Sequence, residues 1–162
     1  MSALLYRPCV GVMLLDARGR VFVGERAGGE GAAPVEKAWQ MPQGGIDPGE
    51  TPLVAARREL WEETGVRSAT LLAEAPDWIR YDLPPELVGK AWKGKWRGQE
   101  QRWFAFRLTG PESEIDLDVA GHGDPEFTAW RWVAMEELPG LVVPFKRATY
   151  EAVVAAFRHL AG

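Results

Sequence analysis

The segment "GGIDPGETPLVAARRELWEETGV", residues 44–66, constrains the fold of this chain more than any other stretch. Thr51 and Pro52 suit the N-cap and the first position of a helix, and Gly65 suits its C-terminal end. The segment therefore predicts a turn-rich loop followed by a helix of about three and a half turns.

The predicted helix has an apolar face and an acidic face. At about 100° per residue, Leu53, Ala56 and Leu60 fall within about 60° of one another, so we expect them to face a sheet. An arc of about 100° on another side holds Glu59, Glu62 and Glu63. Their carboxylates repel one another unless a cation lies among them, and Mg²⁺ prefers such oxygen ligands. Taken alone, such a cluster on a helix is most often a solvated acidic face.

The spacing of the whole segment favours the cation site. It reads Gly-x5-Glu-x7-Arg-Glu-apolar-x-Glu-Glu-x-Gly-apolar, with the defined positions at Gly44, Glu50, Arg58, Glu59, Leu60, Glu62, Glu63, Gly65 and Val66. At every one of these positions the chain resembles the signature box of the Nudix hydrolases. The resemblance implies an α/β fold, an α/β/α sandwich with a mixed β-sheet between helices. It also implies hydrolysis of a nucleoside diphosphate linked to another group, with Mg²⁺ or Mn²⁺ as the cofactor.

The resemblance also implies roles for individual residues. The metal ligands would be Gly44, Glu59, Glu62, Glu63 and, outside the box, Glu126. Arg58 would orient a glutamate and belongs with Glu62 and Glu63 to the catalytic residues, whereas Glu50 would steady the loop and helix. Water would attack phosphorus while a carboxylate takes the proton, and Glu63 and another glutamate remain alternatives for that base. For Glu126, a solvated loop position is the alternative.

Motifs outside the box resemble the bacterial RNA pyrophosphohydrolase and diadenosine polyphosphate hydrolase subgroup. In chain order they are "YRPCVGVMLLD", "AWQMPQGGIDPGE", "WIRYDLP", "GQEQRWF", "DPEFTAWRWV" and "VVPFKRATYEAV". The subgroup implies removal of pyrophosphate from 5′-triphosphorylated RNA, with hydrolysis of dinucleoside polyphosphates as the alternative. Cleansing of oxidised nucleoside triphosphates is disfavoured by these motifs. A non-catalytic nucleotide-binding module is disfavoured because every glutamate of the box is present.

The subgroup resemblance implies a set of substrate-binding residues: Arg7, Arg26, Tyr81, Phe145 and Lys146. Arginine offers a planar fork to phosphate, although surface solubility would also explain both arginines. An aromatic ring can stack on a base, although Phe145 could be a core residue and Tyr81 could pack on a strand. Residues 90–99, "KAWKGKWRGQ", combine basic and aromatic side chains, and we expect a flexible loop there that suits RNA or a polyphosphate.

The rest of the chain predicts strands and one further helix. Strand-like runs occupy 9–15, 20–26, 69–75, 77–83, 101–108 and 127–133, and the first two read as a β-hairpin. Residues 27–38 read as a long surface loop. The last segment, 145–162, carries helical spacing at Tyr150, Val153, Val154 and Phe157. We expect Trp103, Trp130 and Trp132 in the core.

Length and composition set further expectations. A chain of 162 residues suits one domain over 1–162, with a core over about 6–158. The sequence has no apolar run of the roughly 18–20 residues that span a membrane and no export signal, so we expect a cytoplasmic location and no membrane partner. Cys9, the single cysteine, excludes an internal disulfide and is expected to be buried. The net charge of −4 argues against general nucleic-acid binding, and we expect no DNA partner. Nothing in the sequence indicates the oligomeric state.

Overall fold

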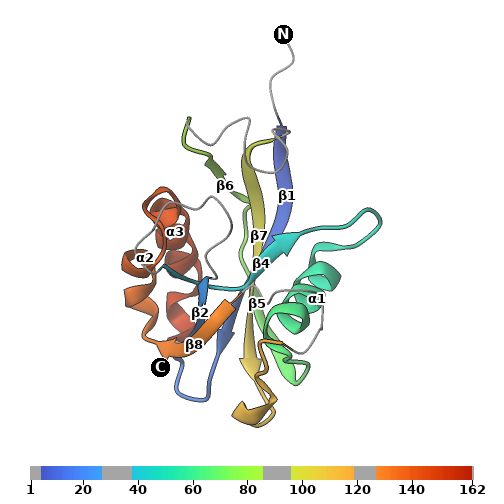
Figure 1. Ribbon diagram of the computed structural model, residues 1–162, viewed down its shortest axis with the longest axis vertical. Helices are drawn as coiled ribbons and strands as arrows, with labels where there is room; N and C mark the ends of the chain where they lie inside the picture. The colour runs from blue at the N-terminus through green and yellow to red at the C-terminus, as the bar shows by residue number, and fades with distance from the viewer. Residues whose placement is uncertain (1–4, 27–37, 86–95, 119–126, 162) are drawn as a thin grey trace.

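The structure, a computed structural model, describes residues 5–26, 38–85, 96–118 and 127–161 (Figure 1). Its strands are β1 (Leu5–Leu15), β2 (Val21–Arg26), β3 (Trp39–Gln40), β4 (Gln43–Gly45), β5 (Ala69–Glu74), β6 (Ile79–Asp82), β7 (Trp96–Leu108) and β8 (Phe127–Val133). Its α-helices are α1 (Pro52–Thr64), α2 (Leu138–Leu141) and α3 (Arg147–Phe157). Short 3-10 turns are η2 (Glu112–Glu114), η3 (Met135–Glu137), η4 (Pro144–Lys146) and η5 (Arg158–Leu160).

The described strands form one mixed sheet. Its main path runs β3-β2-β1-β7-β5, while β4 pairs with β1, β6 with β7, and β8 with β2. The β1–β7 pair is parallel, and the other pairs are antiparallel. Figure 1 shows α1 on one side of the sheet and α2 and α3 on the other. This arrangement confirms the predicted α/β/α sandwich with a mixed sheet.

Each face of the sheet has its own apolar core. On the α1 side, Ala56 and Leu60 are buried against strand residues such as Val12 and Phe104, and Leu53 packs against the same cluster. On the α3 side, the buried helix residues are Tyr150, Val153, Val154 and Phe157. The inward faces predicted for both helices are therefore confirmed.

The start and end of α1 follow from its predicted caps. The hydroxyl of Thr51 accepts a hydrogen bond from the N–H of Val54, and Pro52 opens the helix. Gly65 ends it with φ of 79°, in the left-handed region that glycine adopts most easily. These caps fix where α1 begins and ends, and so where its acidic side chains lie relative to the preceding loop.

Several sequence predictions differ from the structure. Strand β7 begins at Trp96 instead of residue 101, because it pairs with β1 and β6 on both sides, so the loop predicted over 90–99 is wrong for 96–99. The hairpin of β1 and β2 and the burial of Cys9 and Trp103 are confirmed. Trp130 and Trp132 are only half-buried; they pack against the α1-side core and meet each other edge to face.

Other predictions fall on segments outside the described residues. These include residues 27–37 of the expected surface loop, residues 90–95 of the expected basic and aromatic loop, and Glu126. In the described part of the chain, no helix combines the length and the apolar character that crossing a bilayer requires.

Candidate functional site

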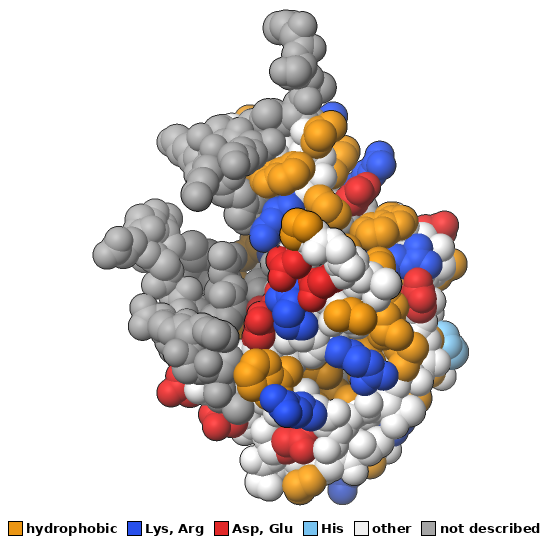
Figure 2. All heavy atoms as spheres, turned by 90° about the vertical axis from the view of Figure 1, so that its right-hand side faces the viewer, with side chains coloured by type: hydrophobic (Ala, Val, Ile, Leu, Met, Phe, Trp, Pro, Cys, Tyr) orange, Lys and Arg blue, Asp and Glu red, His pale blue; other side chains and the backbone are white. Residues whose placement is uncertain are grey.

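Arg58 organises the loop and the acidic edge of α1. Its Nε and Nη2 donate to the two carboxylate oxygens of Glu50 at 2.8 and 2.9 Å, and Nη2 also donates to the carbonyl of Gly45 at 2.8 Å. Its Nη1 donates to Glu59 at 2.8 Å and to Glu62 at 3.1 Å. Acidic and basic side chains accordingly lie side by side on the face that carries α1 (Figure 2).

Glu50 accepts hydrogen bonds from Arg58 with both of its carboxylate oxygens. The guanidinium bonds, with a further hydrogen bond from the Asp47 N–H, lower the pKa of Glu50 to about 2. The same bonds raise the pKa of Arg58. This pair fixes the loop to the helix, which is the position that the box resemblance implied for Glu50.

Two further acids of the box, Glu59 and Glu63, contact β4 from α1. A Cβ atom on Gly44 would lie 2.1 Å from the carboxylate carbon of Glu59, so only glycine leaves room for that side chain. Glu63, which is 7% exposed, accepts a hydrogen bond from the backbone N–H of Gln43 at 2.9 Å. Both carboxylates therefore contact the strand that precedes the helix.

The helical wheel places Glu59, Glu62 and Glu63 in one arc, but in the structure their carboxylates do not all meet at one point. Glu59 and Glu62 meet at Nη1 of Arg58, whereas Glu63 turns to Gln43. Within the described ranges, no three His, Cys, Asp or Glu side chains are grouped to hold a metal ion. The donor set nevertheless suits a hard cation, because one guanidinium faces Glu50, Glu59 and Glu62 and leaves net negative charge among carboxylate oxygens.

A row of polar side chains lies on the α3-facing side of the sheet beside these acids. Strand register places Arg7 opposite Gln99, which in turn lies opposite Tyr81. It also places Gln43 beside Gly11 on β1, and Gln101 bonds the Gln43 side chain from β7. We call this surface the polar floor, and its residues are Arg7, Gln43, Tyr81, Gln99 and Gln101.

Arg7 reaches over β4 at one end of the polar floor. A Cβ atom on Gly45 would lie 2.6 Å from Nη2 of Arg7, so the guanidinium lies across that glycine. Burial raises the pKa of the neighbouring Cys9 thiol to about 11, and Arg7, Glu59 and Lys146 also act on it through their charges. Charges on β1, α1 and η4 therefore act on one buried position of the sheet.

The opposite wall is aromatic and cationic. The rings of Tyr81 and Phe145 lie 5.8 Å apart between centroids, and Nζ of Lys146 lies 5.8 Å from the Tyr81 ring and 6.0 Å from the Phe145 ring. Lys146 is 5% exposed, so its charge is held close to the protein. Behind them, the Tyr150 hydroxyl accepts the Met41 N–H at 2.8 Å; burial raises the pKa of Tyr150, and the charge of Glu63 adds to this.

The structure thus brings four of the predicted substrate-binding residues to one region: Arg7, Tyr81, Phe145 and Lys146. Arg26 ends β2, and its side chain lies outside the described part of the structure, as does Glu126. The sequence indicated no site role for Gln43, Gln99, Gln101 or Tyr150, although it predicted Tyr150 on the apolar side of the last helix. All four lie within the motifs that resemble the subgroup: Gln43 in "AWQMPQGGIDPGE", Gln99 and Gln101 in "GQEQRWF", and Tyr150 in "VVPFKRATYEAV".

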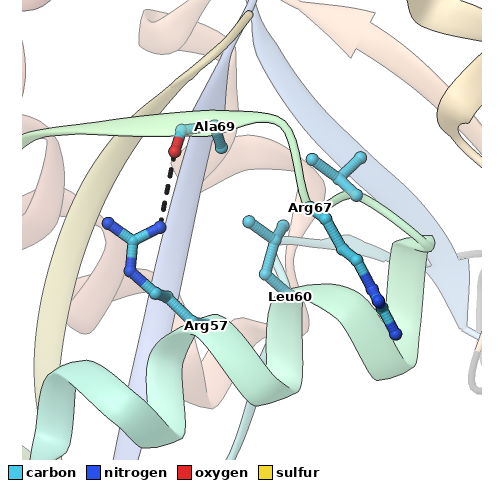
Figure 3. A pocket seen from close by; sticks show the side chains of 5 residues that line it. Arg57, Leu60, Arg67 and Ala69 are labelled. Carbon is cyan, nitrogen blue, oxygen red and sulfur yellow. Dashed lines mark hydrogen bonds between the residues drawn. The ribbon is translucent and has the colours of Figure 1, made fainter. Parts of the chain in front are cut away.

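A shallow pocket elsewhere on the molecule contains none of the predicted site residues. It lies between α1 and the start of β5 and is lined by Arg57, Leu60, Val66, Arg67 and Ala69 (Figure 3). The guanidinium groups of Arg57 and Arg67 lie on opposite sides of Leu60, and Arg57 donates to the Ala69 carbonyl at 3.4 Å. The two cations therefore do not converge on a ligand.

The chain belongs to the NUDIX family, because the model of the NUDIX domain matches residues 5–153. An RNA pyrophosphohydrolase from Agrobacterium fabrum is 60% identical over 164 residues, covering 98% of this chain and 95% of its own. An RNA pyrophosphohydrolase from Rhizobium meliloti is 61% identical over 161 residues, covering 97% of this chain and 96% of its own.

Solved structures share the fold at low sequence identity. A C. elegans Ap4A hydrolase in a binary complex matches with a TM-score of 0.64 and 17% identity, covering 94% of this chain and 98% of that one. The E. coli dihydroneopterin triphosphate pyrophosphohydrolase matches with a TM-score of 0.66 and 20% identity, covering 93% and 98%. At such identities these two likenesses show the fold alone.

Proposed function

We propose that this chain is a divalent-metal-dependent pyrophosphohydrolase that removes pyrophosphate from 5′-triphosphorylated RNA. The observation that carries the proposal is that β4 lies between acidic and cationic side chains, because Gly44 leaves room for the Glu59 carboxylate and Gly45 leaves room for the Arg7 guanidinium. Phosphate hydrolysis needs both kinds of group, acids for the cation and the proton, and cations for the phosphate chain. The names of the Agrobacterium and Rhizobium relatives support RNA as the substrate.

The proposed cofactor is Mg²⁺ or Mn²⁺. Its proposed ligands are the Gly44 carbonyl, Glu59, Glu62, Glu63 and Glu126. When bound, such a cation neutralises phosphate charge and acidifies a bound water. Arg58 contributes by fixing Glu59 and Glu62, and its bonds to Glu50 keep it from leaving the loop.

The substrate would lie along the polar floor. Arg7 and Lys146 supply positive charge for the phosphate chain, and Arg26 is the proposed third cation. The first base would stack on the aromatic rings of Tyr81 and Phe145. Such base–aromatic contacts contribute about 1 to 3 kcal/mol each. The same residues would serve a dinucleoside polyphosphate, which presents the same nucleoside and phosphate string.

The reaction would be attack of water at phosphorus with pyrophosphate as the leaving group. A carboxylate at the edge of α1 takes the proton from water, and Glu63 and Glu62 are the candidates. The hydrogen bond from the Gln43 N–H to one oxygen of Glu63 fixes this carboxylate beside β4. Hydrolysis leaves an RNA that carries a 5′-monophosphate.

The test compares initial rates on 5′-triphosphorylated RNA, diadenosine tetraphosphate and nucleoside triphosphates, each with Mg²⁺, with Mn²⁺ and with chelator. We expect pyrophosphate release to be fastest from RNA, to stop with chelator, and to fall by about 10²-fold or more in Glu63→Gln. Glu151→Gln, an exposed substitution on α3, is the matched control. Faster turnover of diadenosine tetraphosphate would reassign the substrate. A Glu63→Gln variant as active as the parent would refute the catalytic assignment.

The match of the family model over 5–153 supports our proposal that residues 1–162 form one catalytic domain. We further propose that the enzyme works in the cytoplasm, where nascent RNA ends are found, with no membrane or DNA partner. Cell fractionation and fluorescence microscopy of the tagged full chain test this location.

A further inference from the structure

The centre of the polar floor is a chain of hydrogen bonds that begins at a tryptophan. Nε1 of Trp103 donates to Oε1 of Gln101 at 2.9 Å. Nε2 of Gln101 then donates to Oε1 of Gln43 at 2.7 Å and to Oε1 of Gln99 at 2.8 Å. The buried side chain of Gln101 on β7 is therefore hydrogen-bonded both to Gln43 on β4 and to Gln99 on β7.

The chemistry of these groups fixes which end of each amide donates and which end accepts. An indole nitrogen can only donate, so it selects the oxygen end of the Gln101 amide and turns the NH₂ end away. That NH₂ group has two hydrogens, and Gln43 and Gln99 each take one. Gln43 and Gln99 must therefore present their oxygens to Gln101, and their own NH₂ groups face away from it.

These two amides lie beside the groups proposed to hold phosphate. Gln99 has Arg7 as its neighbour on β1 and Tyr81 as its neighbour on β6. Gln43 has its backbone N–H on Glu63. In the part of the chain that the structure describes, the NH₂ groups of Gln43 and Gln99 donate no hydrogen bond, and Gln99 is 2% exposed. Donors without an acceptor beside cations fit an anionic ligand.

We propose that Gln101 is a positioning residue, which Trp103 orients so that the amides of Gln43 and Gln99 present N–H groups to the phosphate chain of the substrate. A reversed Gln101 amide would turn the two outer amides over and present oxygens to the same anion, which would repel it. Because the anion is the substrate's phosphate chain, the role of Gln101 rests on the proposed function. Gln101 gives the hydrogens of its NH₂ group to Gln43 and Gln99, so it has none left to donate to the substrate.

A buried amide chain could also serve only to hold β4 against β7. The two roles differ in what they change. A structural role lowers the melting temperature and leaves the affinity for phosphate groups unchanged in the folded enzyme. An orienting role changes that affinity, and it does so only while Gln43 and Gln99 are present to transmit it.

The test uses two variants of the full chain, Trp103→Phe and Gln101→Met, which remove the orienting N–H and the central amide. Trp132→Phe is the matched control, because it removes an indole N–H that bonds the exposed Glu112 at 2.6 Å. For each protein we would measure the melting temperature, KM and kcat on triphosphorylated RNA with Mg²⁺, and the affinity for inorganic pyrophosphate by calorimetry. All affinities are measured well below the lowest melting temperature.

We expect KM and the Kd of pyrophosphate to rise about tenfold in both variants, with a smaller change in kcat, and to stay unchanged in the control. In a background that carries Gln43→Ala and Gln99→Ala, we expect Gln101→Met to have no further effect on the Kd. Unchanged KM and Kd in both variants would overturn the proposal, and so would an equal further loss in that background. A parent without hydrolase activity would instead refute the proposed function, and the pyrophosphate affinities would still decide the role of Gln101.

Discussion

Replacement of Glu50 by glutamine would separate the loop from α1 without changing the size of the side chain. Glu50 uses both oxygens on Arg58, at 2.8 and 2.9 Å, and one of them also accepts the Asp47 N–H at 2.8 Å. Glutamine keeps one acceptor and turns the other into a donor. At one of the two contacts, an N–H of the glutamine amide would then face an N–H of Arg58.

The magnitude follows from the pKa of Glu50. A pKa lowered from 4.5 to about 2 sets an upper limit of about 3 kcal/mol on the stabilisation from the charged form. Solvent reaches both side chains, since that of Arg58 is 25% exposed and that of Glu50 is 17% exposed. We therefore expect Glu50→Gln to lower the free energy of unfolding by about 1 to 2 kcal/mol at pH 7.

The pH dependence gives the prediction its sign. The pKa of Glu50 is lower in the folded chain than in the unfolded chain, so the stabilisation is complete above about pH 4.5. It is lost as the pH falls from there towards 2. The difference in stability between the parent and Glu50→Gln should therefore be largest at pH 7 and smaller at pH 3.

The assay is urea unfolding of the parent, Glu50→Gln and the control Glu151→Gln at both pH values, with chelator present so that metal binding does not contribute. Glu151 is exposed on α3, so its replacement should leave stability at pH 7 within about 0.5 kcal/mol of the parent. Equal stability of the parent and Glu50→Gln at pH 7 would refute the reasoning. A difference that stays the same at pH 3 would refute its electrostatic origin.

Two glycines of the site yield further predictions. Gly44→Ala would displace the flexible carboxylate of Glu59, so we expect kcat/KM to fall by about 10²-fold with a small change in melting temperature. Gly11→Ala would place a Cβ atom 2.4 Å from the buried indole of Trp103, so we expect urea unfolding to show a loss of about 1 to 3 kcal/mol. Gly140→Ala, where no atom lies within 4 Å, is the control for both, and a loss as large in the control would contradict both.

The parts of the fold that sequence predicts best are those with local signals. The caps of α1, Thr51 and Gly65, are local hydrogen-bond and backbone requirements, and the structure has both at the predicted positions. The apolar spacing of α3 likewise predicted its buried side. Strands β3 and β4 were missed, because two or three residues are too short to show an alternating pattern.

The candidate site was only partly accessible from sequence. The box spacing indicated the acidic edge of α1, yet it gave no sign that Arg58 would hold Glu59 and Glu62 at the same nitrogen atom. The amide chain at Gln101 was not predicted, because a glutamine has no periodic signal of its own. Its partners become visible only when the register between β1, β4 and β7 is known.

The two adjacent glycines of β4 show why this register matters for the reaction. Successive residues of a strand point to opposite faces, so Gly44 and Gly45 face different neighbours. Gly44 leaves space for the carboxylate of Glu59 on α1, and Gly45 leaves space for the guanidinium of Arg7 on the polar floor. A side chain at the first position would disturb the acids proposed to bind the cation, and one at the second would disturb a cation proposed to bind phosphate. A single short strand therefore sets the distance between the two halves of the proposed reaction, and its glycines are required by close approach on both sides.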